Sequence, residues 1–132
     1  MKKFTIILSV VLLVIAGCIG LYFSLTTPKF TGDFTLETYQ QQIDNPEFKS
    51  DNNYGEIKNY KDAVKAAQIA ISDRFETTKG YIFQVNGCTV QYDKENEAYC
   101  VSQHIVFPPV FGGGYKVIIK TDGAIIAIWG EK

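Results

Sequence analysis

The sequence has 132 residues, of which 46% are hydrophobic and 14% aromatic, with a formal net charge of −1 from 13 basic and 14 acidic side chains. This near-neutral balance argues against a nucleic-acid-binding protein, because phosphate binding requires a basic stripe. One His, one Met and three Cys leave few ligands for a metal cluster, so we expect neither a metal site nor a cofactor. The length accommodates one small domain and an appendage.

The first predicted element is an apolar helix over residues 4–25, a stretch of 22 residues without a charged side chain or a proline. At about 1.5 Å per residue this helix is roughly 33 Å long, enough to cross a hydrocarbon core of about 30 Å. Lys2 and Lys3 precede it, and excess positive charge stays on the cytoplasmic side of a membrane. The sequence therefore predicts a transmembrane anchor over residues 1–25. The remaining residues, 26–132, carry 11 basic and 14 acidic side chains, a net charge of −3, and are expected on the extracytoplasmic side.

A lipoprotein signal peptide is a second interpretation of the same segment. Residues 15–18, Ile-Ala-Gly-Cys, resemble a lipobox, in which cleavage before the cysteine leaves Cys18 to carry the lipid. The residues that follow Cys18 stay apolar as far as Leu25, whereas a lipoprotein usually continues with a polar tether. This continuation favours an uncleaved single-pass helix. Both alternatives place the domain on the same side of the membrane.

Residues 26–58 are predicted to form a polar spacer, because Pro28 ends the apolar helix and a stretch rich in Asp, Asn, Gln, Thr and Lys follows. Within it, residues 35–43 predict a short helix that ends at Asp44-Asn45-Pro46. Several aromatic side chains are scattered through the spacer, and we expect them to pack on the following domain: Phe30, Phe34, Tyr39, Phe48 and Tyr54.

The main helix is predicted to begin after Asn59, a favourable N-cap residue, with Asp62 in its first turn. Its apolar residues recur every three or four positions and form one stripe: Tyr60, Val64, Ala67, Ile71 and Phe75. The opposite side is polar and is expected to face solvent.

Strands are predicted after Gly80, because apolar residues there occur at every second position and residues typical of turns recur between these runs. Asn86-Gly87 is a strong signal for a hairpin turn, and Thr121-Asp122-Gly123 predicts another. The predicted strands are residues 81–85, 88–92, 98–107, 115–120 and 124–129. The fold class is therefore α+β, with one main helix packed on a curved antiparallel sheet of about five strands.

Two cysteines lie on neighbouring predicted strands. A register that pairs Val90 with Ala98 sets Cys88 opposite Cys100, and such a pair in an exported domain favours a structural disulfide. Two free buried thiols or a redox site are the alternatives. A disulfide closing a loop of about 13 residues stabilises a small domain by roughly 3 kcal/mol in the chain-entropy model.

Catalytic candidates are few. His104 and Ser102 fall on the same face of a predicted strand, but a nucleophile and base also need a third group to orient them. The run Gly112–Gly114 lacks the following Lys-Ser/Thr of a phosphate-binding loop. We therefore predict that the protein is not an enzyme.

The order of a helix followed by a meander that ends in GGGYKVIIKTDGAIIAIWGEK is similar to a family of predicted bacterial immunity proteins. The similarity covers about residues 59–132, and its last strands match the family at Gly113, Gly114, Tyr115, Lys120, Asp122, Gly123, Gly130 and Lys132. The resemblance implies a reduced fold related to nuclear transport factor 2. It also implies a non-enzymatic role, in which the domain binds and neutralises a cognate bacterial polymorphic toxin.

We expect the toxin to bind an apolar loop held between proline and glycine, because such a loop is costly to leave in water without a partner. The candidate contact residues are Phe107, Pro108, Pro109, Val110, Phe111 and Tyr115. The alternative function is a lipid-anchored or membrane-anchored binding module for a small ligand or a component of the cell envelope. A degenerate enzyme of the same fold is a third possibility.

Overall fold

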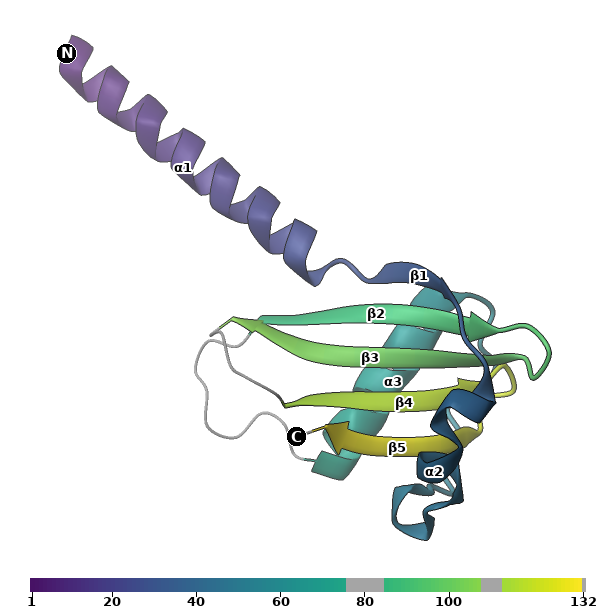
Figure 1. Cartoon of the computed structure of the whole chain (residues 1–132). Coiled ribbons are helices and arrows are strands. Elements are labelled where there is room, and N and C mark those ends of the chain that lie inside the picture. The colour runs from purple at the N-terminus through teal and green to yellow at the C-terminus, as the bar shows by residue number, and fades with distance from the viewer. Residues whose placement is uncertain (76–84, 108–112, 132) are drawn as a thin grey trace.

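A long N-terminal helix projects from an α+β domain (Figure 1). The computed structural model describes residues 1–75, 85–107 and 113–131. Helix α1 (Lys2–Thr26) has 25 residues, none of them buried, and by length and composition it is able to cross a membrane. It ends where Thr27 adopts an extended backbone before Pro28, as the sequence predicts.

The domain is built on one five-stranded sheet with the spatial order β1-β2-β3-β4-β5. The strands are β1 (Lys29–Asp33), β2 (Val85–Asp93), β3 (Ala98–Phe107), β4 (Gly114–Lys120) and β5 (Ile125–Glu131). Strand β1 pairs with β2 in parallel, and the other pairs are antiparallel, so the sheet is mixed rather than antiparallel as predicted. The parallel pair is possible because the long connection through α3 returns the chain to the same end of the sheet.

The predicted hairpin at Asn86-Gly87 is wrong. Strand β2 continues through both residues, with a register shift between Val85 and Asn86, and Gly87 pairs with His104 of β3. A methyl group added to Gly87 would lie 2.7 Å from Nε2 of His104, so this glycine permits a close approach and not a turn. The long ladder with β3 outweighs the local turn preference. Residues 81–84, the rest of the other predicted strand, lie outside the described residues.

Helix α3 (Tyr60–Phe75) covers one face of the sheet, and its predicted start and apolar stripe are confirmed (Figure 1). Oδ1 of Asn59 accepts a hydrogen bond from the backbone N–H of Asp62 at 3.0 Å, and Oδ2 of Asp62 accepts one from the N–H of Lys58 at 3.1 Å. These two bonds satisfy donors that a helix start otherwise leaves free. The helix buries six side chains against the sheet: Ala63, Val64, Ala66, Ala67, Ala70 and Ile71.

The segment between β1 and α3 covers the other face of the sheet. It contains the short helices η1 (Leu36–Tyr39), α2 (Gln40–Asp44) and η2 (Pro46–Phe48), which confirms a helical turn before Asp44-Asn45-Pro46. Its apolar side chains pack on Ile118 and Trp129 of the sheet: Phe34, Leu36, Tyr39, Ile43 and Phe48. The stretch predicted as a spacer therefore contributes one strand and one covering layer to the domain.

The β4–β5 turn forms where the sequence predicts it. It accepts hydrogen bonds from the end of the segment between β1 and α3. Gly123 has a φ of +90°, and a methyl group there would collide with the backbone of Gly55. The N–H of Tyr54 donates to the carbonyl of Gly123 at 3.0 Å, and the N–H of Ile57 donates to that of Thr121 at 2.8 Å. The turn thus needs glycine for both its conformation and its close packing.

A buried carboxylate connects the β2–β3 turn to the segment between β1 and α3, which we call the N-terminal segment. Asp93 is 3% exposed and accepts hydrogen bonds from the backbone N–H groups of Leu36, Glu95 and Asn96 and from the Asn96 side chain, at 2.9–3.1 Å. Burial acts to raise the pKa of the Asp93 carboxyl, but these hydrogen bonds outweigh it and hold the pKa below its ordinary value of 3.8. The charged form of Asp93 is therefore the form that stabilises the fold.

We expect Asp93→Ala to lower the free energy of unfolding at pH 7 by about 2–3 kcal/mol, because it leaves several donors without a charged acceptor. Urea unfolding of the full chain in detergent, followed by the fluorescence of the single, buried Trp129, measures this loss. The difference from the unaltered protein should shrink as the pH falls through the lowered pKa of Asp93, since stability from a depressed carboxyl is lost on protonation. The exposed Glu95 provides the control, and Glu95→Ala should change the stability little at any pH.

Candidate partner-binding surface

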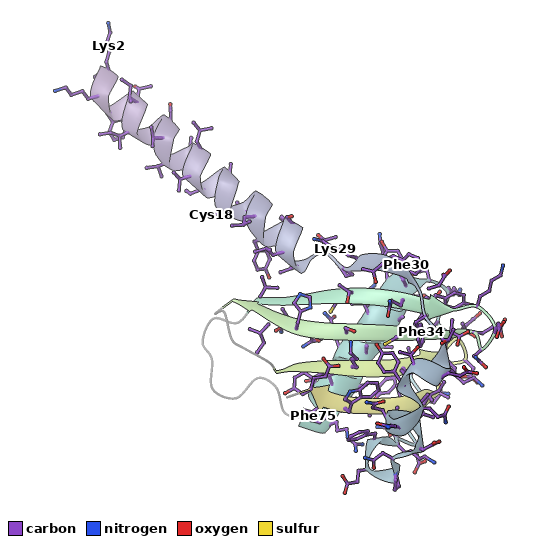
Figure 2. All side chains as sticks on the ribbon, viewed as in Figure 1. Lys2, Cys18, Lys29, Phe30, Phe34 and Phe75 are labelled. Atoms are coloured by element: carbon purple, nitrogen blue, oxygen red, sulfur yellow. The ribbon has the colours of Figure 1, made fainter. Side chains whose placement is uncertain are left out.

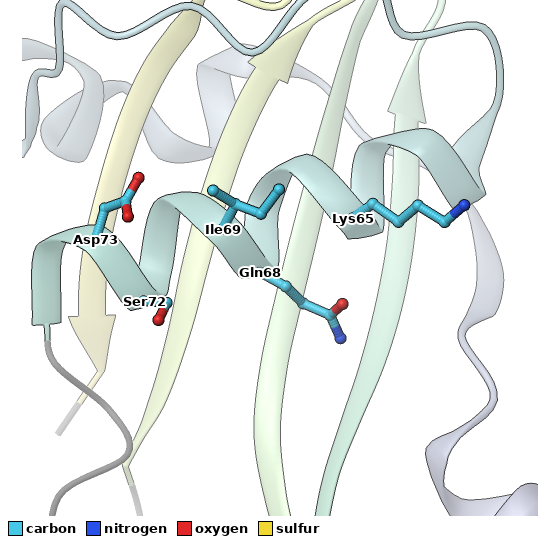
Figure 3. A pocket seen from close by; sticks show the side chains of 5 residues that line it. All are labelled: Lys65, Gln68, Ile69, Ser72 and Asp73. Carbon is cyan, nitrogen blue, oxygen red and sulfur yellow. The ribbon is translucent and has the colours of Figure 1, made fainter.

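The outward face of α3 carries a shallow hollow of about 450 Å³, lined by Lys65, Gln68, Ile69, Ser72 and Asp73 (Figure 3). Ile69 is the middle one of these five residues in the sequence, and it is 54% exposed. Among the described residues outside α1, Ile69 and Phe30 are the large apolar side chains that remain exposed. The hollow therefore combines one accessible apolar side chain with polar neighbours.

A second hollow, of about 270 Å³, adjoins the first, because Lys65 and Ile69 line both. It extends toward the segment before α3, where Tyr54, Glu56 and Ile57 contribute to its wall. The two hollows form one continuous surface over the middle of α3, which we call the α3 surface. An apolar centre surrounded by polar groups of both charge signs is the usual anatomy of a protein–protein interface.

The sequence places Ile69 on the α3 surface by its spacing. The buried stripe uses positions 63, 64, 66, 67, 70 and 71, so position 69 points outward together with positions 65, 68, 72 and 73. The prediction that this side of the helix is polar holds for Lys65, Gln68 and Ser72 but not for Ile69. The sequence does contain a signal for the exposure of Ile69, because it is an isoleucine among outward-facing positions that are otherwise polar or charged.

The predicted interface loop is only partly within the described chain. Residues 108–111 and the side chain of Phe107 lie outside it. Tyr115 is described and is half-buried; its ring packs on Phe75 with 4.7 Å between the ring centroids. Tyr115 therefore supports the core beneath the end of α3, and its assignment as a contact residue is not favoured by this packing.

The predicted disulfide is incompatible with the observed register. Strand β2 pairs Cys88 with Gln103 and Gln91 with Cys100, so the two cysteines point to opposite faces of the sheet. Cys88 packs in the layer under α3, and Cys100 packs in the layer with Trp129. Both thiols are free and buried, and burial raises the pKa of each. The predicted register is wrong by three residues because the turn begins at Asp93, which pairs with Ala98.

Ser102 and His104 share one face of β3, as predicted, but the structure gives Ser102 another partner. Nζ of Lys116 donates a hydrogen bond to Oγ of Ser102 at 2.8 Å and lies 3.6 Å from a carboxylate oxygen of Glu131. The ammonium also lies 5.7 Å from the ring centroid of Tyr39. This cluster links β3, β4 and β5 to the N-terminal segment. Within the described ranges no group of three His, Cys, Asp or Glu side chains could hold a metal ion.

We expect Cys88 and Cys100 to react with a maleimide only after denaturation, because both thiols are buried. In a Cys18→Ser background, a reducing agent should leave the urea midpoint of Trp129 fluorescence unchanged. If a disulfide closed this loop, reduction would remove about 3 kcal/mol of stability and shift the midpoint clearly. Such a shift would contradict the observed register.

The chain matches no protein-family model, no curated protein and no solved structure. The likeness to bacterial immunity proteins therefore depends on the sequence motifs of residues 59–132 alone. The architecture itself is an α+β domain with a five-stranded mixed sheet and an apolar N-terminal helix.

Proposed function

We propose that this chain is a membrane-anchored immunity protein that binds a cognate toxin on the extracytoplasmic side and neutralises it without catalysing a reaction. The observation that supports binding best is the α3 surface, where Ile69 is 54% exposed between two adjoining hollows. An exposed apolar side chain at the centre of a polar helix face gains most when a partner buries it. The order of motifs in residues 59–132 supports the identity of that partner as a toxin.

The charges around Ile69 suit recognition of a specific partner. Lys65 lies one turn before Ile69, and Asp73 lies one turn after it (Figure 3). Glu56 and Asp62 line the second hollow, so the α3 surface carries one positive and three negative side chains. A partner with the opposite arrangement is favoured, and one with the same arrangement is repelled. The net charge of −3 over residues 26–132 adds a weak preference for a basic toxin.

Anchoring is the second part of the proposal. Helix α1 exposes apolar side chains along its whole length, and its 25 residues correspond to about 37 Å. We place it across the membrane as a single span with Lys2 and Lys3 on the cytoplasmic side. Cys18 lies within the uninterrupted helix, and its side chain is exposed (Figure 2). Lipidation of Cys18 remains the alternative anchor.

The interface is tested by co-expression with the product of the neighbouring gene as the candidate toxin, with growth and complex formation as readouts. Ile69→Lys should weaken binding at least about tenfold and remove protection, because it places a charge at the centre of the interface. Lys65→Glu should weaken binding by reversing the one positive charge among the residues that line the two hollows. Lys94→Glu is the control, since Lys94 is exposed in the β2–β3 turn and is not among the residues that line the two hollows.

Each variant must first retain the Trp129 fluorescence of the folded protein. Full protection by both α3 variants would exclude the α3 surface, and loss of protection on alanine substitution of residues 107–111 would then assign the interface to that loop. Absence of rescue by the unaltered chain would refute the immunity function.

The anchor is tested with Cys18→Ser. If α1 spans the membrane, this variant should stay in the membrane fraction after an alkaline wash and migrate at the same mass as the unaltered chain. If lipid on Cys18 is the anchor, the variant should instead lose its acyl chain and accumulate as an unprocessed precursor.

A further inference from the structure

A hollow of about 230 Å³ lies where α1 meets the sheet. Its wall comes from the end of α1, the start of β1 and the adjoining parts of β2 and β3. The residues that line it include Leu25, Thr27, Lys29, Thr89, His104 and Val106. Figure 2 shows Lys29 at the junction of α1 and β1. We call this place the junction site.

The junction site is tied to the end of the apolar helix. Leu25 belongs to the last turn of α1 and also lines the hollow. The apolar part of α1, residues 4–25, is roughly 33 Å long and a hydrocarbon core is about 30 Å thick, so its last turn at Leu25 lies at the edge of the core. In a chain anchored by α1, the junction site therefore lies at the depth of the lipid headgroups.

The side chains of the junction site fall into two chemical groups. Lys29 supplies an ammonium, His104 an imidazole, and Thr27 and Thr89 supply hydroxyl groups, all of which bind phosphate oxygens. Leu25 and Val106 supply apolar wall. None of the residues described as lining the hollow is acidic.

The backbone keeps His104 accessible. In the sheet, His104 lies between Gly87 of β2 and Gly114 of β4, so neither neighbouring strand places a side chain beside its ring. A methyl group on Gly87 would reach within 2.7 Å of Nε2 of His104. The nearest acidic residue along this row of the sheet, Glu131, lies on β5 and is engaged with Lys116 at 3.6 Å.

We propose that the junction site binds the headgroup of an anionic phospholipid from the leaflet on the domain's side. Lys29 and His104 contact the phosphate, the threonine hydroxyls donate further hydrogen bonds, and Leu25 and Val106 contact the upper part of an acyl chain. This proposal rests on the anchoring by α1 proposed above and is independent of the toxin. A bound lipid would hold the domain close to the bilayer and limit its rotation about residues 27–28.

The lipid is favoured over free phosphate by position and by the apolar wall. A headgroup at the depth of the junction site is present at high local concentration, and its acyl chain covers Leu25 and Val106, which inorganic phosphate leaves exposed. An anionic lipid is favoured over a zwitterionic one because a choline group would bring a second cation toward Lys29.

The test uses the full chain in nanodiscs that contain phosphatidylcholine and phosphatidylglycerol in equal amounts. Native mass spectrometry of the protein released from the nanodiscs should detect preferential retention of phosphatidylglycerol. Lys29→Gln should reduce this preference about fivefold, the effect of one lysine near an anionic surface. His104→Ala should also reduce it, whereas the matched control Lys94→Gln, in the distant β2–β3 turn, should leave it unchanged.

His104 is the only histidine of the chain, so its ring resonances report directly on the junction site. They should shift when phosphatidylglycerol is added to phosphatidylcholine nanodiscs. Inorganic phosphate added to phosphatidylcholine nanodiscs should have little effect, and an equal response would overturn the choice of a lipid.

The remaining outcomes separate this proposal from the proposed function. Equal retention of both lipids by a fully incorporated chain, or a preference that survives Lys29→Gln, overturns the junction site and leaves the immunity function standing. Failure of the chain to enter nanodiscs overturns the anchoring and the junction site together. Loss of toxin binding in otherwise unchanged nanodiscs concerns the α3 surface alone.

Discussion

The antiparallel pairing of β2 with β3 sets the arrangement of both layers that pack on the sheet. Its register pairs Val90 with Val101 and Gln91 with Cys100, and so decides which side chains face α3 and which face the N-terminal segment. A shift by one residue would exchange the two sets, because side chains alternate along a strand. Asp93 holds this register at the turn, where its carboxylate accepts four hydrogen bonds.

Both faces of the sheet are covered, one by α3 and the other by the N-terminal segment. The two layers differ in the size of the side chains that they pack on the sheet. Helix α3 packs a face rich in alanine closely on Val90, Val101 and Val117. The N-terminal segment instead packs larger side chains on the other face, where Trp129 lies within 5.5 Å of Tyr39 and 6.1 Å of Phe48 between ring centroids. Since this second cover belongs to residues 29–48, the chain from β1 onward folds as one unit with the sheet.

The arrangement separates two surfaces with different chemistry. The α3 surface lies on the outer side of a helix that covers one face of the sheet, while the junction site lies at the end of the sheet next to α1 (Figure 1). A partner bound as we propose on the α3 surface therefore need not compete with the lipid proposed at the junction site. The proposed anchoring through α1 would also raise the local concentration of the domain at the membrane, which favours capture of a partner that arrives there.

The elements that depend on local interactions can be predicted from the sequence. The apolar length of α1, the Asn59 and Asp62 cap of α3, its buried stripe, and the Gly123 turn all follow from neighbouring residues in the chain. Three features were not predictable from the sequence and emerge from the folded domain: the parallel pairing of β1, the continuity of β2 through Asn86-Gly87, and the placement of Cys88 and Cys100 on opposite faces. These features depend on the pairing of strands far apart in the chain and on the packing of α3 and the N-terminal segment on the sheet. The free energy of such contacts comes from residues far apart in the chain, so a local turn signal or the spacing of two cysteines does not reveal it.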